Sequence, residues 1–168
     1  MSSIESKLLE PGQCGAKLSG LQGRIGFCTG CFDILQSGHA VFFEQCKECC
    51  DHLVVVVGRG KNIGKLKPGR PINQDNNRLF LVAALEPVDF AVLGDEEYSM
   101  GKIDCVTFCD DVHPDVYIVN DDDSGLDQKR DFSRDRGIEL VTVPRVVPSF
   151  LQPTSTTEII EKAKISTS

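Results

Sequence analysis

The sequence predicts one α/β domain built on a Rossmann-like, doubly wound sheet of five parallel strands. Short apolar runs alternate along the chain with amphipathic stretches of helical period, and such alternation favours parallel strands joined by right-handed crossovers. Residues 53–57 are apolar without a break, which is typical of a strand covered on both faces. The length of 168 residues suits a single domain. In this fold a ligand binds at the carboxyl ends of the strands, where the strand order reverses.

The apolar runs and the helical stretches give the expected order of elements. Strands are expected at 24–28, 53–57, 88–93, 116–119 and 138–143, and helices at 38–51, 75–85, 102–112, 127–136 and 155–164. Asn73 is a plausible N-cap of the 75–85 helix, which places Leu79, Val82 and Ala83 on its inner side. Residues 1–22 lack clear periodicity and contain several glycines, so we expect a loosely attached N-terminal arm before a domain at 23–168.

Composition and charge exclude several classes of protein. Hydrophobic residues make up 40% and charged residues 26% of the chain, an ordinary globular mixture that argues against disorder, collagen and a disulfide miniprotein. The net charge of −7 argues against a protein that coats nucleic acid, which needs a basic stripe. The chain opens without a signal-peptide pattern, and its longest apolar run is far too short for a membrane span, so we expect a cytoplasmic protein with no membrane partner.

Eight cysteines allow two interpretations. Cys28-x-x-Cys31 and Cys46-x-x-Cys49 have a spacing that resembles a zinc ribbon. Ribbon ligands sit in short turns, whereas Cys28 ends a predicted strand and Cys46 lies in a predicted helix. We therefore favour buried thiols in a reducing compartment and expect no metal held by these side chains. A zinc-ribbon scaffold remains the alternative, which metal analysis would decide.

Residues 29–39 carry the densest group of chemically informative side chains. They leave the first predicted strand through a Gly-containing turn and enter a helix that begins near Gly38 and His39. A helix start offers free backbone N–H groups and the positive end of the helix dipole, which together bind anions. Gly38 lets the backbone approach a phosphate, His39 can donate a hydrogen bond, and Asp33 can accept local N–H bonds. The segment predicts a phosphate site.

The same segment resembles a known family. Residues 30–39 read Gly-Cys-Phe-Asp-Ile-Leu-Gln-Ser-Gly-His, similar to the G-x-F-D-x-x-H-x-G-H motif of the cytidylyltransferase-like nucleotidylyltransferases, which include glycerol-phosphate cytidylyltransferases and heptose-phosphate adenylyltransferase domains. Gln36 replaces the first histidine of the motif; its amide can donate to a phosphate but carries no titratable proton. Residues 70–78 resemble the family's R-P-[VI]-N-x₄-R stretch, and 154–158 resemble its I-S-T-T helix start. The resemblance spans residues 24–164.

The resemblance implies transfer of a nucleoside monophosphate from CTP to a small phosphorylated or phosphonate acceptor, with release of pyrophosphate. It also implies Mg²⁺ carried mainly by the nucleotide phosphates and a homodimer. One alternative is an adenylyltransferase that uses ATP and a sugar phosphate. Another is a nucleotide-binding module that has lost catalysis through Gln36.

Residue roles follow from the matched motifs. The resemblance assigns catalysis to His39, Gln36, Lys65 and Arg78. It assigns nucleotide binding to Thr29, Gly30, Cys31, Phe32, Asp33, Gly38, His39, Asn120, Ser155, Thr156 and Thr157. It assigns binding of the acceptor to Lys65, Lys67, Arg70 and Arg78, which lie within the one basic cluster of an acidic chain.

Three features stay open at the level of sequence: residues 120–123, the start of the last helix and the reach of Arg145. Residues 120–123 form either a nucleotide- or Mg²⁺-contacting loop or a solvated acidic turn. Ser155 and Glu158 also have the spacing of an ordinary capping box. The helix at 127–136, with its alternating charges, is expected on the surface, laced with i,i+4 pairs. Arg145 precedes a longer loop than in the family, so its reach to the phosphates is undecided.

Overall fold

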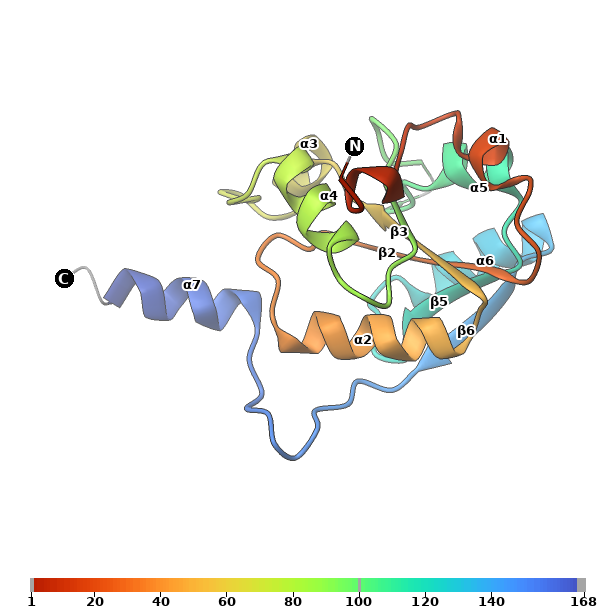
Figure 1. Ribbon diagram of the computed structural model, residues 1–168. Helices are drawn as coiled ribbons and strands as arrows, with labels where there is room; N and C mark the ends of the chain where they lie inside the picture. Colours follow the sequence, from red (N-terminus) through yellow and green to blue (C-terminus); the bar gives the residue numbers. More distant parts are fainter. Residues whose placement is uncertain (1, 100, 166–168) are drawn as a thin grey trace.

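A computed structural model describes residues 2–99 and 101–165 and shows one parallel sheet with helices on both faces (Figure 1). The six strands lie in the order β1-β4-β3-β2-β5-β6. The strands are β1 (Leu8–Leu9), β2 (Ile25–Gly30), β3 (His52–Val57), β4 (Phe90–Leu93), β5 (Val116–Asn120) and β6 (Glu139–Val143). The helices are η1 (Glu5–Lys7), α1 (Cys14–Leu18), α2 (Ser37–Glu48), α3 (Gly60–Leu66), α4 (Asp75–Ala83), α5 (Val106–Val112), α6 (Leu126–Arg136) and α7 (Thr156–Ile165). The predicted single α/β domain with a parallel sheet is confirmed, but the sheet has six strands and not five.

The strand β3 shows why the sheet is doubly wound. Its residues 53–57 are 0% exposed, and successive side chains enter opposite layers of core. Val55 packs into the layer that holds α2 and α4, while Val54 packs into the layer that holds α1, α5 and α6. Burial of one such side chain contributes about 1.5–3 kcal/mol, so an unbroken apolar strand is stable only between two covered faces.

The sixth strand comes from the N-terminal segment, which is packed against the domain and not loosely attached. Leu8 and Leu9 pair with Ala91 and Val92 of β4. Farther along, the N–H of Gly15 donates to an Asp111 carboxylate oxygen at 2.9 Å, and α1 packs on α5. A two-residue strand and a five-residue helix are too short to produce a periodic pattern, which is why the sequence did not reveal them.

Other details also differ from the prediction. Residues 60–66 form α3, where no helix was expected. The helix α5 begins at Val106 and not at residue 102, because the Asp95 carboxylate accepts the N–H groups of Val106 and Thr107 and so fixes the start. The N-cap of α4 is Gln74 and not Asn73.

The strand order reverses beside β2, which pairs with β3 on one side and β5 on the other. The connections after β2 and β5 therefore leave the sheet in opposite directions and open a crevice at their carboxyl ends. After β6 a long segment passes beneath α2 and leads to α7, which projects from the body beside the start of α2 (Figure 1). Within the described residues no helix is long and apolar enough to span a membrane.

Candidate active site

A cavity of about 330 Å³ lies at this crevice. It is lined by the β2–α2 connection, the end of β5, the first turns of α6 and α7, and residues that follow α3. Of the predicted nucleotide-binding residues, it brings together Thr29, Gly30, Cys31, Phe32, Asp33, Gly38, His39, Asn120, Thr156 and Thr157. Ser155 does not line it. Lys67 and Arg70, predicted for the acceptor, line the same cavity.

The turn after β2 depends on close packing between Gly30 and Phe32. A Cβ at Gly30 would lie 2.6 Å from the Phe32 ring, so a larger residue would displace that ring. Phe32 itself has a positive φ of 46° and is 6% exposed. Its ring meets the His39 imidazole edge-on, with 5.5 Å between centroids. Gly30 therefore makes room for the side chain that orients His39.

The start of α2 fixes the protonation of His39. Gln36 is the N-cap: its Oε1 accepts from the Gly38 N–H at 2.5 Å, and its own N–H donates to His39 Nδ1 at 3.3 Å. Because Nδ1 accepts this bond, the proton of the neutral ring resides on Nε2. Burial and the nearby Arg145 guanidinium lower the pKa of His39 below 6.5. His39 therefore presents a neutral Nε2–H donor at neutral pH.

Gln36 has a different place from the one predicted. Its side chain does not line the cavity; it lines a separate crevice of about 20 Å³ with residues that include Val146 and Leu151. The Gln36 side-chain oxygen caps the helix, and this cap orders the backbone N–H groups at the start of α2 that could bind an anion. Direct donation from Gln36 to a phosphate stays a prediction.

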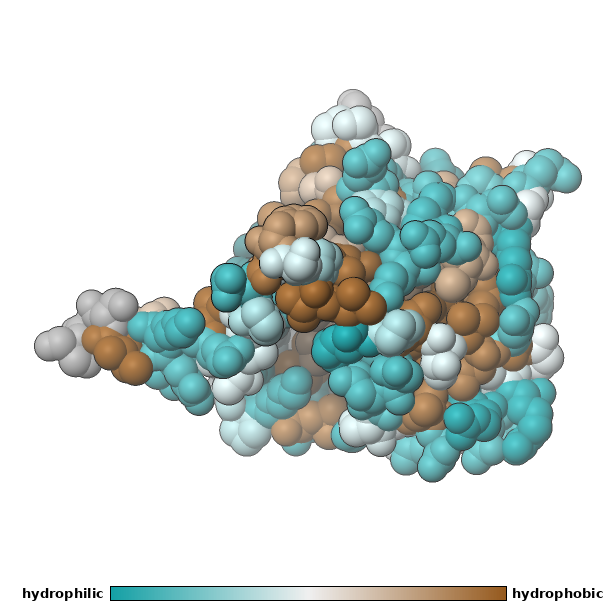
Figure 2. Space-filling view, turned by 90° about the horizontal axis from the view of Figure 1, so that it is seen from below, coloured by the Kyte–Doolittle hydropathy of each residue, from teal (hydrophilic) through white to brown (hydrophobic). Residues whose placement is uncertain are grey.

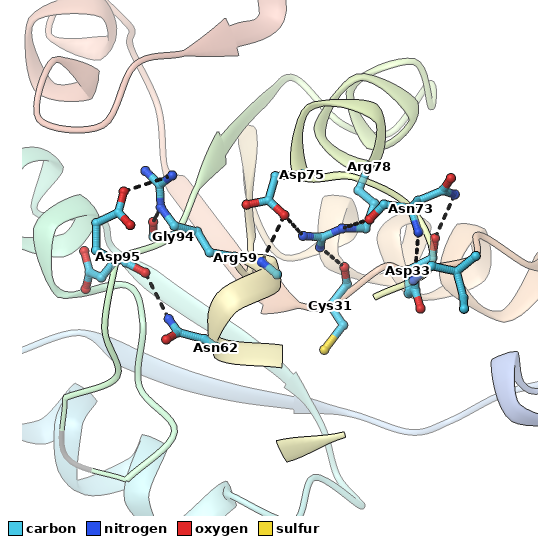
Figure 3. A network of polar contacts seen from close by, with 12 residues as sticks. Cys31, Asp33, Arg59, Asn62, Asn73, Asp75, Arg78, Gly94 and Asp95 are labelled. Atoms are coloured by element: carbon cyan, nitrogen blue, oxygen red, sulfur yellow. Dashed lines mark hydrogen bonds and ion pairs between the residues drawn. The ribbon is translucent and has the colours of Figure 1, made fainter. Parts of the chain in front are cut away.

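Asp33 holds the loop before α4 against the site (Figure 3). It is 4% exposed, and its Oδ1 accepts from the backbone N–H groups of Ile72 and Asn73 at 2.7 and 2.9 Å. Its Oδ2 pairs with Arg70 at 3.1 Å, and the Asn73 amide returns a bond to the Asp33 carbonyl. The stretch that resembles R-P-[VI]-N is thus a partner of the motif aspartate. Asn73, expected as a helix cap, is one of these tethers.

Neither Arg78 nor Lys65, both predicted to bind the acceptor, lines the cavity. Arg78 is 0% exposed, and its guanidinium donates to the carbonyls of Cys31 and Asn73 and to the Asp75 carboxylate (Figure 3). Lys65 extends to Glu97 on the surface and does not line the cavity. For the buried Arg78 the predicted contact with the acceptor is corrected, because this residue supports the loops of the site from within. For Lys65 an acceptor contact stays a prediction.

Two cations that the sequence did not assign complete the cavity wall. Lys129 is 13% exposed and pairs with Asp123 at 2.7 Å, and Arg145 makes two bonds to Asp122 at 2.8 and 3.0 Å. Both line the cavity. The acidic run after β5 therefore positions cations at the site. With Lys67 and Arg70, four cations face two lining carboxylates, so the cavity of this acidic protein carries positive charge.

The alternating charges of residues 127–136 predict a surface helix and so give Lys129 no role in the site. Its role in the site could have been inferred from its position in the first turn of the helix that follows β5, next to the switch in strand order.

The start of α7 forms another part of the cavity wall, beside the start of α2. Ser155 accepts from the Glu158 N–H and donates its own N–H to the Glu158 carboxylate, so the predicted capping box is present. Thr156 donates to the carbonyl of Ile34 at 3.3 Å, which ties α7 to the β2–α2 connection. The wall of the cavity here is formed by Thr156 and Thr157.

The cysteines lie in separate surroundings. Cys28 and Cys46 are buried in the core layer beneath α2, and burial raises the pKa of the Cys46 thiol. Cys31 faces the cavity, where burial also raises its pKa. Across residues 2–99 and 101–165, no three His, Cys, Asp or Glu side chains gather as metal ligands would.

Comparison with known proteins decides the family. The profile of the family described as cytidylyltransferase-like matches residues 27–162, which include every motif described above. The chain belongs to this family. Family membership makes the chain a member of a nucleotidyltransferase superfamily and agrees with the resemblance seen in the motif at 30–39.

Individual relatives cover different shares of their own length. An FAD synthase from Ferroglobus placidus is 38% identical over 136 residues, 80% of this chain and 84% of the relative. The bifunctional protein HldE from Nitratiruptor sp. is 33% identical over 144 residues, but the chain spans only 28% of that protein. Among solved structures, a lipopolysaccharide core biosynthesis protein from Thermoplasma volcanium superposes with a TM-score of 0.63 at 29% identity, covering 75% of this chain and all of the other.

Proposed function

We propose that the protein transfers a nucleoside monophosphate from a nucleoside triphosphate to a small phosphorylated acceptor and releases pyrophosphate. One observation carries the proposal: a neutral His39 donor, two helix starts and four cations converge on one cavity at the switch point of the sheet. Such an arrangement suits a polyanion. An acceptor phosphate oxygen is already a nucleophile, so the protein must align it and stabilise charge, without forming a covalent intermediate.

The contacts described above support a separate role for each part of the cavity wall. The acceptor oxygen forms a bond to the α-phosphorus while the bond from that phosphorus to the β-phosphate bridging oxygen breaks. His39 Nε2–H and the backbone N–H groups at the start of α2 would bind the α- and β-phosphates. The start of α7 with Thr156 and Thr157 would hold the departing pyrophosphate. Lys67 and Arg70 would hold the acceptor.

Mg²⁺ is proposed as a companion of the nucleotide. The two carboxylates that line the cavity are engaged, Asp33 by Arg70 and Asp123 by Lys129. The residues therefore fit a cation held mainly by phosphates, as is usual for Mg²⁺. When bound it would neutralise phosphate charge.

ATP is now the favoured donor, although the sequence motifs favoured CTP by a small margin. The support is a relative named FAD synthase, matched over 84% of its length, whose named product contains an adenylyl group. CTP remains the alternative, and a direct comparison of the two nucleotides separates them.

The test compares His39→Ala with His52→Gln, since His52 lies at the opposite end of the sheet, where its imidazole contacts the Gln22 carbonyl. Pyrophosphate release is measured with ATP and with CTP, using glycerol 3-phosphate and sugar phosphates as acceptors. We expect His39→Ala to reduce turnover by about 10²–10³-fold and His52→Gln to retain it. Equal turnover of both variants would refute the role of His39. Nucleotide binding by the wild type without any pyrophosphate release would favour the non-catalytic module.

A homodimer also remains a proposal. Seen from below, hydrophobic side chains gather on the face that carries the segment after β6 (Figure 2). Val146, Val147 and Phe150 of that segment are 44%, 44% and 83% exposed. Light scattering of the wild type and of Phe150→Asp would test whether this face joins two copies.

A further inference from the structure

A second cavity, of about 260 Å³, adjoins the candidate active site. Six residues line both cavities: Thr29, Gly30, Cys31, Lys67, Asp123 and Lys129. Most of the remaining wall comes from α3 and from the connection between β4 and α5. The second cavity is therefore a chamber that opens beside the proposed reacting phosphates, with Cys31 between the two.

The carboxyl of Asp104 lines this chamber, and in the described part of the chain its partner is the Asp104 backbone N–H. Asp104 is only 8% exposed, yet in the described part of the chain no other residue forms a hydrogen bond or ion pair with its carboxylate. Burial, together with the nearby Asp95 carboxylate, raises its pKa to about 6, against the opposing effect of Lys129. A buried carboxyl that no other residue pairs with destabilises the fold and is a candidate for ligand recognition.

Two strand ends leave space for this carboxyl. A Cβ at Gly58, just after β3, would lie 3.1 Å from Asp104 Oδ2, and one at Gly94, just after β4, would lie 2.7 Å from the Asp104 carbonyl oxygen. Larger residues at either position would press on Asp104.

The rest of the chamber indicates the chemistry of its ligand. Lys67, Lys102 and Lys129 supply positive charge for a phosphate, and Ile63 and Leu66 supply an apolar wall for a carbon chain. An ammonium group on the ligand would meet these lysines, which favours uncharged hydroxyl donors as partners of Asp104.

We propose that Asp104 determines acceptor specificity by accepting a hydrogen bond from a non-reacting hydroxyl of a phosphorylated polyol or sugar, whose phosphate is held by Lys67 at the junction of the two cavities. This inference rests on the proposed nucleotidyl transfer and adds a residue that selects the acceptor. A hydroxylated phosphate fills the unpaired position of the carboxyl, whereas a phosphate without hydroxyls leaves it desolvated and unpaired.

The test measures binding and turnover separately on the full chain. Glycerol 3-phosphate and glucose 1-phosphate are compared with propyl phosphate, which lacks hydroxyls, by isothermal titration. The proteins are the wild type, Asp104→Asn, Asp104→Leu and the control Glu44→Gln, an exposed carboxyl on α2. We expect the wild type and the control to prefer a hydroxylated phosphate by about 10- to 100-fold, and Asp104→Leu to bind all three alike. We expect Asp104→Asn to lose part of the preference and to unfold at no lower temperature than the wild type.

Three results would overturn the inference: no hydroxylated phosphate binds the wild type, the wild type shows no preference, or Asp104→Leu keeps the wild-type preference. If that preference persists in Asp104→Leu while pyrophosphate is released, the inference fails and the proposed function stands. If the preference depends on Asp104 but no pyrophosphate is released with either nucleotide, the proposed function fails and the binding role of Asp104 stands.

Discussion

Replacement of Asp33 tests how the loop before α4 is held against the site. Asp33→Ala removes the acceptor of two backbone N–H groups and of the Arg70 guanidinium at once. Asp33→Asn retains Oδ1 for both N–H groups and replaces the oxygen that faces Arg70 with an NH2 group, so it removes the ion pair and its hydrogen bond. The two variants therefore separate the backbone bonds from the ion pair.

The magnitudes follow from burial. The Asp33 side chain is 3% exposed and the Arg70 side chain 16%, so this pair is poorly screened by water. Loss of the charge-assisted bond alone is expected to cost about 1–2 kcal/mol in Asp33→Asn. Leaving the N–H groups of Ile72 and Asn73 unpaired as well raises the expected cost in Asp33→Ala to about 3–5 kcal/mol.

Equilibrium unfolding in urea gives the free energy of unfolding of each variant. Asp131→Ala is the control, because the Asp131 side chain is 55% exposed in its pair with Arg134 and should change stability by less than about 0.5 kcal/mol. A loss below about 1 kcal/mol in Asp33→Ala, or equal losses in the alanine and asparagine variants, would refute this account of the loop.

Three further predictions concern buried and titrating groups. Arg78→Met should lower the free energy of unfolding by about 2–4 kcal/mol, and Lys65→Met by less than about 0.5 kcal/mol, because only Arg78 is buried; urea unfolding that ranks them equally would contradict this. The raised pKa of Asp104, about 6 against 3.8 when unfolded, keeps the folded state protonated longer as pH rises, so stability should fall from about pH 4 to 6.5 by up to about 3 kcal/mol. Asp104→Asn should therefore gain stability over the wild type at pH 8 but not at pH 4, and identical pH profiles would count against it. The lowered pKa of His39 keeps the ring neutral in the folded state, so the stability linked to His39 is fully present above pH 6.5 and declines below it. Turnover is measured over the same pH range in the wild type and in His39→Gln. A fall in turnover between pH 8 and 7 in the wild type alone would show that the ring is charged and would contradict this account.

The sheet could be predicted because its signals are local. The unbroken apolar run in β3 needs two covered faces, and the helices α2, α4 and α6 show their own period. The edge strand β1 could not be predicted, because Leu8 and Leu9 become a strand only by pairing with β4. The helix α3 escaped for a similar reason: its seven residues include two glycines and two lysines, and only Asn62 and Ile63 among them are buried.

The residues of the candidate site likewise divide into those that the sequence could predict and those that it could not. Residues in one short segment, such as Gly30, Asp33 and His39, could be predicted because the motif and the helix start lie together in sequence. Lys129 and Asp104 could not, because the fold brings each to the site from a segment that carries no site motif of its own. Arg78 shows the reverse error: an arginine in a basic cluster resembles a ligand until the fold shows its guanidinium enclosed by backbone carbonyls.

One measurement tests the central claim most directly. The wild type is incubated with Mg²⁺, ATP or CTP, and a phosphorylated acceptor such as glycerol 3-phosphate or glucose 1-phosphate, and the products are followed by ³¹P NMR. The account predicts pyrophosphate and a new phosphate–phosphate linkage between nucleotide and acceptor, appearing in equal amounts. Unchanged nucleotide with every acceptor, or pyrophosphate without a joined product, would contradict it.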